Sequence, residues 1–192
     1  MPFFREWFAQ LQAAELPEWF EVNAMTLSTA HPAGGACSRI VLLKAIEDES
    51  FRFFTNYESD KGMQIAAQPL VALHFFWPVF DRQVRIEGIA SKCSAASSDQ
   101  YFASRPRSSQ LGAIASPQSR ILEDEQRLEQ TIADLDSQFA DRTIPRPESW
   151  GGYQVFPDKM EFWQGKPSRL HDRFRYTRSS ESGSWLIERI AP

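Results

Sequence analysis

Residues 70–93, LVALHFFWPVFDRQVRIEGIASKC, decide the fold class of this sequence. Leu70 to Trp77 is almost entirely apolar, and from Arg82 to Cys93 apolar residues alternate with polar ones, which is the two-residue period of a β-strand. The segment between them, Pro78 to Asp81, has room only for a turn. The two strands are therefore predicted to pair as an antiparallel hairpin.

Further strand-like segments lie on both sides of this hairpin. They are residues 24–30, 38–46, 51–56, 153–156, 160–164, 175–178 and 185–190, with a turn predicted at Ser179–Ser184. No crossover helix of useful length separates the first five strands, so an antiparallel barrel is predicted rather than a parallel sheet. The predicted fold class is mainly β with flanking helices.

An amphipathic helix is predicted near the N-terminus, over residues 3–15. Phe4, Trp7, Phe8 and Leu11 recur there at helical spacing and form one apolar stripe. That stripe must pack against another surface.

Three further helices are predicted, over residues 59–68, 97–105 and 119–140. In the first, Ser59 is the expected N-cap and Pro69 ends the helix. Because this helix follows a strand directly, its free N–H groups favour an anion beside Lys61. The alternative is that Lys61 is a solvated surface lysine. Residues 105–119 have no apolar period and are predicted to form a loop rich in hydroxyl and guanidinium donors.

The composition is that of one ordinary globular domain, residues 1–192, with residues 1–20 as an N-terminal helical segment. The chain of 192 residues is 42% hydrophobic and 24% charged, and its formal charge of -4 argues against a nucleic-acid partner. Cys37 and Cys93 fit neither a disulfide framework nor a metal knuckle, so free thiols in the cytoplasm are expected. No apolar run is long enough to span a membrane.

Several common chemistries have no motif here. The sequence contains no GxGxxG, no GxxxxGK[ST] and no GxSxG. His31, His74 and His171 lack the neighbouring ligands of a zinc site, so no metal is expected. His74 lies in an apolar strand and is read as a hydrogen-bonded core histidine.

Residues 160–173, MEFWQGKPSRLHDR, are poor core material. Arg169, His171 and Arg173 are each two residues apart and would point to the same side of an extended chain, where they could line one cleft for an anionic ligand. A solvated loop is the alternative.

Six segments, in this order and spacing, carry a more specific signal. They are RIVLLK (39–44), FFTN (53–56) followed by Lys61, RQVRIEG (82–88), YFASRPRSSQLGA (101–113), QS (118–119) and FWQGKPSRLHDR (162–173). Together they resemble the pyridoxine/pyridoxamine 5'-phosphate oxidases, FMN enzymes of the split-barrel fold. The resemblance runs from about residue 20 to Pro192.

The resemblance implies FMN as the cofactor. Arg39 and Lys61 match the family residues that hold the FMN phosphate, which agrees with the chemistry of a guanidinium and an ammonium at a helix start. The other implied FMN contacts are Ile40, Val41, Leu42, Leu43, Lys44, Phe54, Thr55, Gln83, Gln118, Ser119, Trp163 and Arg173.

The resemblance also implies the substrate site and the reaction. Lys44, Tyr101, Arg105, Ser109, Arg169 and His171 match residues that bind a phosphorylated B6 vitamer, with Arg169 and His171 as the catalytic pair that positions and polarises it. The implied reaction oxidises pyridoxine or pyridoxamine 5'-phosphate to pyridoxal 5'-phosphate by hydride transfer to FMN, with dioxygen as acceptor and hydrogen peroxide as product, and with ammonia released from the amine. A homodimer with FMN between the subunits is implied, and the N-terminal aromatic stripe is one candidate for that contact.

Two departures from the family pattern stand out. Asp60 occupies a position where the family usually has a basic residue, so weaker FMN binding is expected. Residues 1–20 contain no basic, Tyr-containing segment of the kind that covers the substrate in many relatives, so either less shielding from water or no need of a lid is expected. The alternatives are a flavin oxidase of another aromatic compound such as a phenazine precursor, a non-catalytic FMN or pyridoxal-phosphate binding protein, and a purely structural β-barrel.

Overall fold

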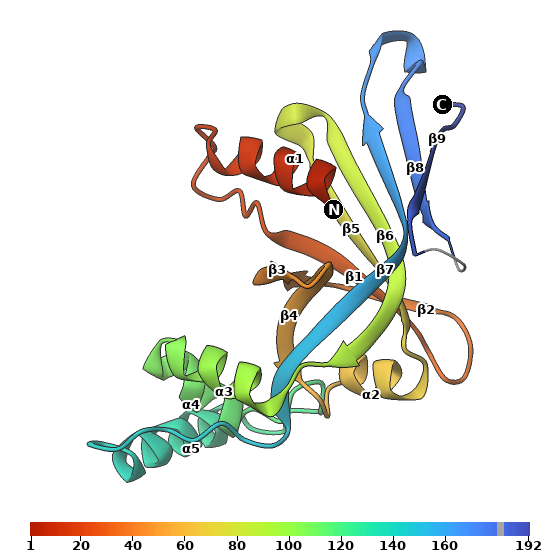
Figure 1. The fold of residues 1–192 in the computed structure, drawn as a ribbon. Coiled ribbons are helices and arrows are strands. Elements are labelled where there is room, and N and C mark those ends of the chain that lie inside the picture. The colour runs from red at the N-terminus through yellow and green to blue at the C-terminus, as the bar shows by residue number, and fades with distance from the viewer. Residues whose placement is uncertain (180–182) are drawn as a thin grey trace.

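A single curved antiparallel sheet forms the body of the protein in the computed structural model, which describes residues 1–179 and 183–192 (Figure 1). The strands in this part of the chain are β1 (Ala24–Ala30), β2 (Ala36–Leu42), β3 (Ala45–Glu47), β4 (Ser50–Asn56), β5 (Leu70–Trp77), β6 (Arg82–Lys92), β7 (Trp150–Gln164), β8 (Asp172–Arg178) and β9 (Trp185–Arg189). Their order is β2-β1-β5-β6-β7-β4-β3, with β8 paired to β7 and β9 paired to β8. The predicted mainly β, antiparallel architecture is confirmed, as a half-barrel.

The hairpin of β5 and β6 forms as predicted. Its register runs from Leu70 opposite Ile89 to Trp77 opposite Arg82, around a short turn in which Asp81 has a positive φ of 50°. Along β5 every second side chain is buried, so this strand turns one apolar face toward the core.

Two strand predictions are wrong, one because the chain changes partner strands and the other because a strand continues through a bulge. The predicted strand 38–46 breaks after Leu42: the Leu43 N–H donates to Asn23, whereas the Lys44 N–H donates to Arg52 of β4. The predicted strands 153–156 and 160–164 are one continuous strand, β7.

A bulge carries β7 past Pro157. The register between β6 and β7 shifts between Glu87 and Gly88. Gly88 is required there, since a Cβ at this position would lie 2.1 Å from the carbonyl oxygen of Phe156.

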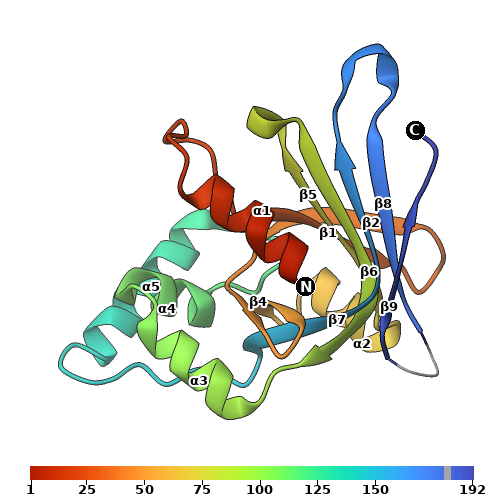
Figure 2. The same ribbon diagram turned by 45° about the horizontal axis from the view of Figure 1, so that its top comes forward.

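The helices in the described ranges are α1 (Pro2–Gln12), α2 (Asp60–Ala67), α3 (Ala95–Ser104), α4 (Arg107–Ala115) and α5 (Glu125–Gln138). The helices α3, α4 and α5 lie together on one side of the molecule, away from β8 and β9 (Figure 2). Helix α2 begins as predicted, because the Ser59 hydroxyl accepts a hydrogen bond from the Gly62 N–H. None of the helices that the structure describes is long and apolar enough to cross a membrane.

Two helix predictions are wrong in their extent. Residues 107–115, predicted as loop, form α4, which buries only Gln110 and Leu111 and therefore has no apolar period. Helix α5 begins only after Asp124, whose side chain caps it, and Ile121 of the predicted helical face is 92% exposed. The predicted turn at Ser179–Ser184 lies partly outside the described residues.

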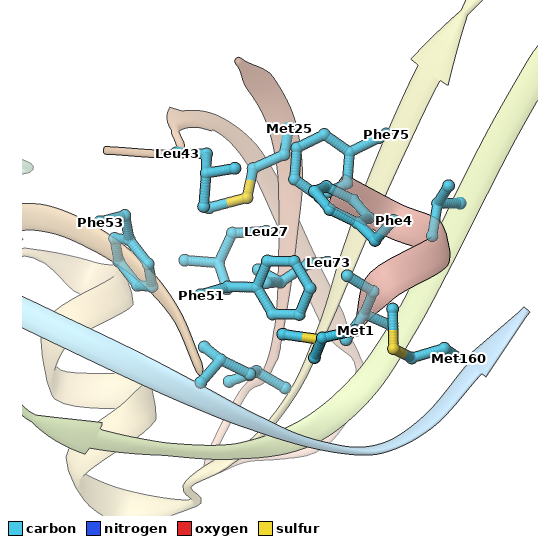
Figure 3. Close-up of a cluster of buried hydrophobic side chains, with 14 of the residues drawn as sticks. Met1, Phe4, Met25, Leu27, Leu43, Phe51, Phe53, Leu73, Phe75 and Met160 are labelled. Atoms are coloured by element: carbon cyan, nitrogen blue, oxygen red, sulfur yellow. The ribbon is translucent and has the colours of Figure 1, made fainter. Parts of the chain in front are cut away.

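The apolar stripe of α1 packs into the concave side of its own sheet (Figure 3). Phe4 is fully buried, with its ring centroid 4.9 Å from that of Phe51 and 5.1 Å from that of Phe75. Trp7 and Leu11 are also buried. The suggestion that this stripe belongs to a subunit contact is therefore wrong: it completes the core of one chain.

We predict that Phe4→Ala costs about 3–5 kcal/mol of unfolding free energy, because it empties a fully buried ring site. The matched control is Phe8→Ala, on the same helix, whose ring is only half-buried and whose loss should be clearly smaller. Urea unfolding of the three proteins at one protein concentration measures both values. Equal losses for the two variants would contradict the packing described.

Candidate active site

A cavity of about 750 Å³ opens between β2, β4 and the helices α2, α3 and α4. It brings together eleven of the predicted site residues: Ile40, Val41, Leu42, Lys44, Phe54, Thr55, Lys61, Tyr101, Arg105, Ser109 and Gln118. These residues lie far apart in the sequence. The fold therefore brings residues from several of the six segments into one cavity.

Lys61 lies in this cavity on the first turn of α2. Its Nζ donates to Ser59 Oγ at 3.0 Å and to Gln118 Oε1 at 2.9 Å, and Gln118 also accepts from the Thr55 hydroxyl at 3.3 Å. Burial, the largest cause, and the nearby Arg39 charge together lower the pKa of Lys61 to about 8, although the Asp60 carboxylate acts in the opposite direction. A half-buried ammonium with neutral partners, at a helix N-terminus, suits an anion.

The guanidinium of Arg39 supplies a second positive charge near Lys61, although Arg39 does not itself line the cavity. It donates to Thr29 Oγ1 at 2.6 Å, to Gln64 Oε1 at 2.9 Å and to the Leu27 carbonyl at 3.2 Å. All of these acceptors are neutral. Among the described residues, neither cation forms an ion pair with a carboxylate, and two such cations at a helix N-terminus fit a dianionic phosphate such as that of FMN.

A separate cation site lies in the same cavity at Arg105. Its Nη1 is buried without a hydrogen-bond partner in the described structure, and burial lowers the pKa of the guanidinium. The guanidinium lies 4.6 Å from the centre of the Trp150 ring. A buried donor without an acceptor is costly, so this geometry calls for an anionic ligand, with the Ser109 hydroxyl in the same wall.

Aromatic rings form the wall beside Arg105. The Phe54 and Tyr101 rings are stacked at 3.9 Å, and the Trp150 ring is nearly parallel to that of Tyr101, at 6.2 Å. Such a wall suits a planar aromatic ligand. Trp150 was not predicted as a site residue, because it contacts Arg105, which is far away in the sequence, and because no motif contains it.

A second group of predicted residues lies at the far end of β7. Gln83, Trp163 and Arg173 are opposite one another on β6, β7 and β8. His74 is half-buried rather than in the core, and its Nε2 lies 2.9 Å from Gln83 Oε1, so it is hydrogen-bonded as predicted. Arg173 forms an ion pair with Glu161 at 2.8 Å.

The chain between Trp163 and Arg173 is a hairpin turn and not an extended segment. Ser168 and Arg169 have positive φ values of 58° and 60° in a short helical turn that begins at Pro167. The predicted shared side for Arg169, His171 and Arg173 is therefore wrong, because Pro167 and the tight turn end the two-residue alternation.

His171 lies beside Trp163, with ring centroids 4.6 Å apart. Its Nδ1 accepts the Lys166 N–H at 3.1 Å, so a neutral imidazole carries its proton on Nε2. Arg169 lies on the exposed part of the turn.

Two more predicted residues lie outside the cavity. The Leu43 side chain is 4% exposed and belongs to the core of the barrel. Ser119 follows Gln118 on an exposed loop with a φ of 72°.

Solved structures show the class of protein to which this fold belongs. PhzG from Burkholderia lata 383, in complex with tetrahydrophenazine-1-carboxylic acid, matches with a TM-score of 0.92 and 28% identity over 100% of this chain and 91% of that one. An FMN-binding protein from Nostoc punctiforme described as related to pyridoxamine 5'-phosphate oxidase matches with a TM-score of 0.72 and 18% identity over 93% and 100%. The chain is thus a split barrel of the FMN-binding type.

Sequence comparison defines the family within this class. Residues 12–139 match the pyridoxamine 5'-phosphate oxidase model, and residues 150–192 match the pyridoxine 5'-phosphate oxidase C-terminal dimerisation region, which supports a homodimer. Proteins named pyridoxine/pyridoxamine 5'-phosphate oxidase from Rhodopirellula baltica and Salinibacter ruber are 49% and 50% identical over 98% of this chain and 85% and 87% of theirs. The chain belongs to the pyridoxine/pyridoxamine 5'-phosphate oxidase family.

The lowered pKa of Lys61 can be measured directly. In protein whose lysines carry ¹³C-methyl groups, we expect the Lys61 resonance to titrate near pH 8, below its ordinary value of 10.5. Lys61→Arg identifies the resonance by removing it. Inorganic phosphate should shift the titration upward, because a bound anion favours the ammonium. Titration together with exposed lysines would contradict the burial of this group.

Proposed function

We propose that the protein is an FMN-dependent oxidase that converts pyridoxine 5'-phosphate and pyridoxamine 5'-phosphate to pyridoxal 5'-phosphate, with dioxygen as electron acceptor. One observation carries the proposal: the cavity presents two separate cation sites, one at Lys61 and one at Arg105, with an aromatic wall beside the second. A flavin phosphate and a phosphorylated pyridine together need two such sites. The roughly 50% identity to relatives named for this activity supports the same assignment.

The residues of this chain have distinct roles in the proposed reaction. When bound, FMN supplies the two-electron oxidation, with dioxygen as final acceptor and hydrogen peroxide as product. Lys61 and Arg39 hold its phosphate, and Thr55 and Gln118 contact the cofactor from the same wall. Arg105, Ser109 and Tyr101 hold the phosphate of the substrate, while Lys44, exposed in the cavity, supplies a further positive charge near it.

The two groups of site residues support an FMN position between two subunits. Trp150 and Trp163 stand near opposite ends of β7, a strand of 15 residues that covers roughly 50 Å when straight. We infer that one FMN does not contact both groups of a single chain. Gln83, Trp163, Arg169, His171 and Arg173 would therefore reach the cofactor and substrate held by the partner, and all but Gln83 lie in the dimerisation region.

Two alternatives differ from the proposed function, one in its substrate and the other in the lack of turnover. A flavin oxidase of another aromatic compound is suggested by the likeness to PhzG, but its 28% identity is well below that of the relatives named for B6 vitamers. Such a substrate without a phosphate would leave the three donors Tyr101, Arg105 and Ser109 with less to bind. A non-catalytic binding protein would use the same contacts without turnover.

The deciding experiment follows the colour of the protein. After reconstitution with FMN, the yellow protein should bleach anaerobically on addition of pyridoxine 5'-phosphate and recover its colour in air. Arg105→Met should remain yellow but need roughly ten- to a hundredfold more substrate, because it loses charge-assisted hydrogen bonds to the substrate phosphate. Unphosphorylated pyridoxine is the matched substrate control.

Each other outcome of this experiment would indicate a different function. A colourless protein that cannot be reconstituted would exclude both flavin functions. A yellow protein that never bleaches would favour the binding protein. Bleaching by a phenazine precursor but not by a B6 vitamer would favour the other oxidase.

Asp60 tunes the same cofactor site. It is exposed on the first turn of α2, where its carboxylate stabilises the helix N-terminus but also repels a phosphate beside Lys61. We predict that Asp60→Arg tightens FMN binding by about three- to tenfold at low salt and less at high salt. Asp60→Asn should fall between the two. Fluorescence titration of the apoprotein measures all three affinities, and an unchanged affinity would refute the expected weakening by Asp60.

A further inference from the structure

We propose that Thr29 and Gln64 are positioning residues that hold the Arg39 guanidinium beside Lys61 before the cofactor binds, so that the phosphate site is preformed. The inference rests on the proposed binding of FMN and assigns to that site two residues that do not line the cavity. Neither residue belongs to the motifs that point to the site.

The three side chains form a closed ring of hydrogen bonds. Arg39 Nη1 donates to Thr29 Oγ1 at 2.6 Å and Arg39 Nη2 donates to Gln64 Oε1 at 2.9 Å. The Thr29 hydroxyl donates to the same Gln64 oxygen at 2.5 Å. Thr29 is 2% exposed and Gln64 6% exposed, so these bonds have little competition from water.

The ring joins three elements at the place where the anion would bind. Thr29 lies on β1, Arg39 on β2 and Gln64 on α2, one turn after Lys61. The same helix therefore presents one cation and fixes the other. Without such bonds a long Arg side chain has many rotamers and would move away from a like charge.

Because Thr29 and Gln64 are neutral, the positive charge of Arg39 remains available to an anion. Two arginines of β8 pair with carboxylates instead: Arg173 with Glu161 and Arg175 with Glu188, each at 2.8 Å. A carboxylate next to Arg39 would neutralise it and repel a phosphate. Hydroxyl and amide oxygens orient the guanidinium and leave its full charge, with Nε–H and other donors, for an incoming anion.

The ring also opposes a repulsion that the site creates. The Arg39 charge is close enough to lower the pKa of Lys61, so the two cations destabilise each other until an anion binds. Holding them together beforehand moves that cost from the binding step to folding. Preorganisation of this kind increases affinity without adding a contact.

The test compares Thr29→Val, which removes the hydroxyl and keeps the shape, with Thr29→Ser, which keeps the hydroxyl. Affinities of the apoproteins for FMN and for riboflavin are measured by flavin fluorescence. Thr29→Val should weaken FMN binding by about tenfold and leave riboflavin binding unchanged, because only the phosphate contact depends on Arg39. Thr29→Ser should bind FMN like the natural protein.

A double-variant cycle tests whether Thr29 acts through Arg39. In an Arg39→Met background, Thr29→Val should have no further effect on FMN affinity. Gln64→Met is similar in shape to the natural residue but lacks the acceptor oxygen, so it should weaken FMN binding as much as Thr29→Val does. It therefore replaces Thr29→Val in the test if Thr29→Val does not fold. Thermal unfolding confirms that each variant is folded.

The possible failures are distinguishable. Unchanged FMN affinity in Thr29→Val and Gln64→Met would overturn the positioning role while the proposed function stands. Equal weakening of FMN and riboflavin would also overturn it, since a general structural defect does not discriminate by the phosphate. A natural protein that binds neither flavin would overturn the proposed function itself.

Discussion

The pairing of β7 with β4, β6 and β8 is the constraint on which the rest of the molecule depends. This strand runs the length of the half-barrel (Figure 1), and its bulge opposite Gly88 lets one continuous strand serve all three partners. The ring of Trp150, the first residue of β7, lies against the Arg105 guanidinium in the cavity. Near the other end of the strand, the Trp163 ring lies beside that of His171. Each group of site residues thus contains a tryptophan that β7 positions.

Several arginines and lysines of this chain form ion pairs with carboxylates, whereas the cations of the candidate site do not. On β7 and β8, Lys159, Arg173 and Arg175 are paired with carboxylates. In the part of the chain that the structure describes, Arg39, Lys61 and Arg105 have neutral partners or, at Arg105 Nη1, none. A chain with a formal charge of -4 thus has, among its described residues, cations without a carboxylate partner at the site where we propose that anions bind.

Much of the fold was predictable, because local patterns report local structure. The alternation in β5 and β6 and the Ser59 cap of α2 each reflect a single element. The break between β2 and β3 was not predictable, since it is set by a change of partner strand. The same limit applies to the candidate site: motif resemblance indicated Lys61 and Arg105, whereas no spacing in the sequence reveals the contacts of Trp150, Thr29 and Gln64.

The turn at Arg169 interrupts the two-residue alternation of side chains that the sequence predicts for residues 169–173. Positive φ at two successive residues other than glycine costs about 1–3 kcal/mol each and persists only where neighbouring structure fixes it. Here the ladder holds Trp163 opposite Arg173 and Gln164 opposite Asp172, and Asp172 binds both Lys166 and Arg189. The strained turn is therefore held at both ends. Arg169 and His171 are presented by a braced hairpin, which is the kind of frame required by our proposal that both residues reach a site held by the partner subunit.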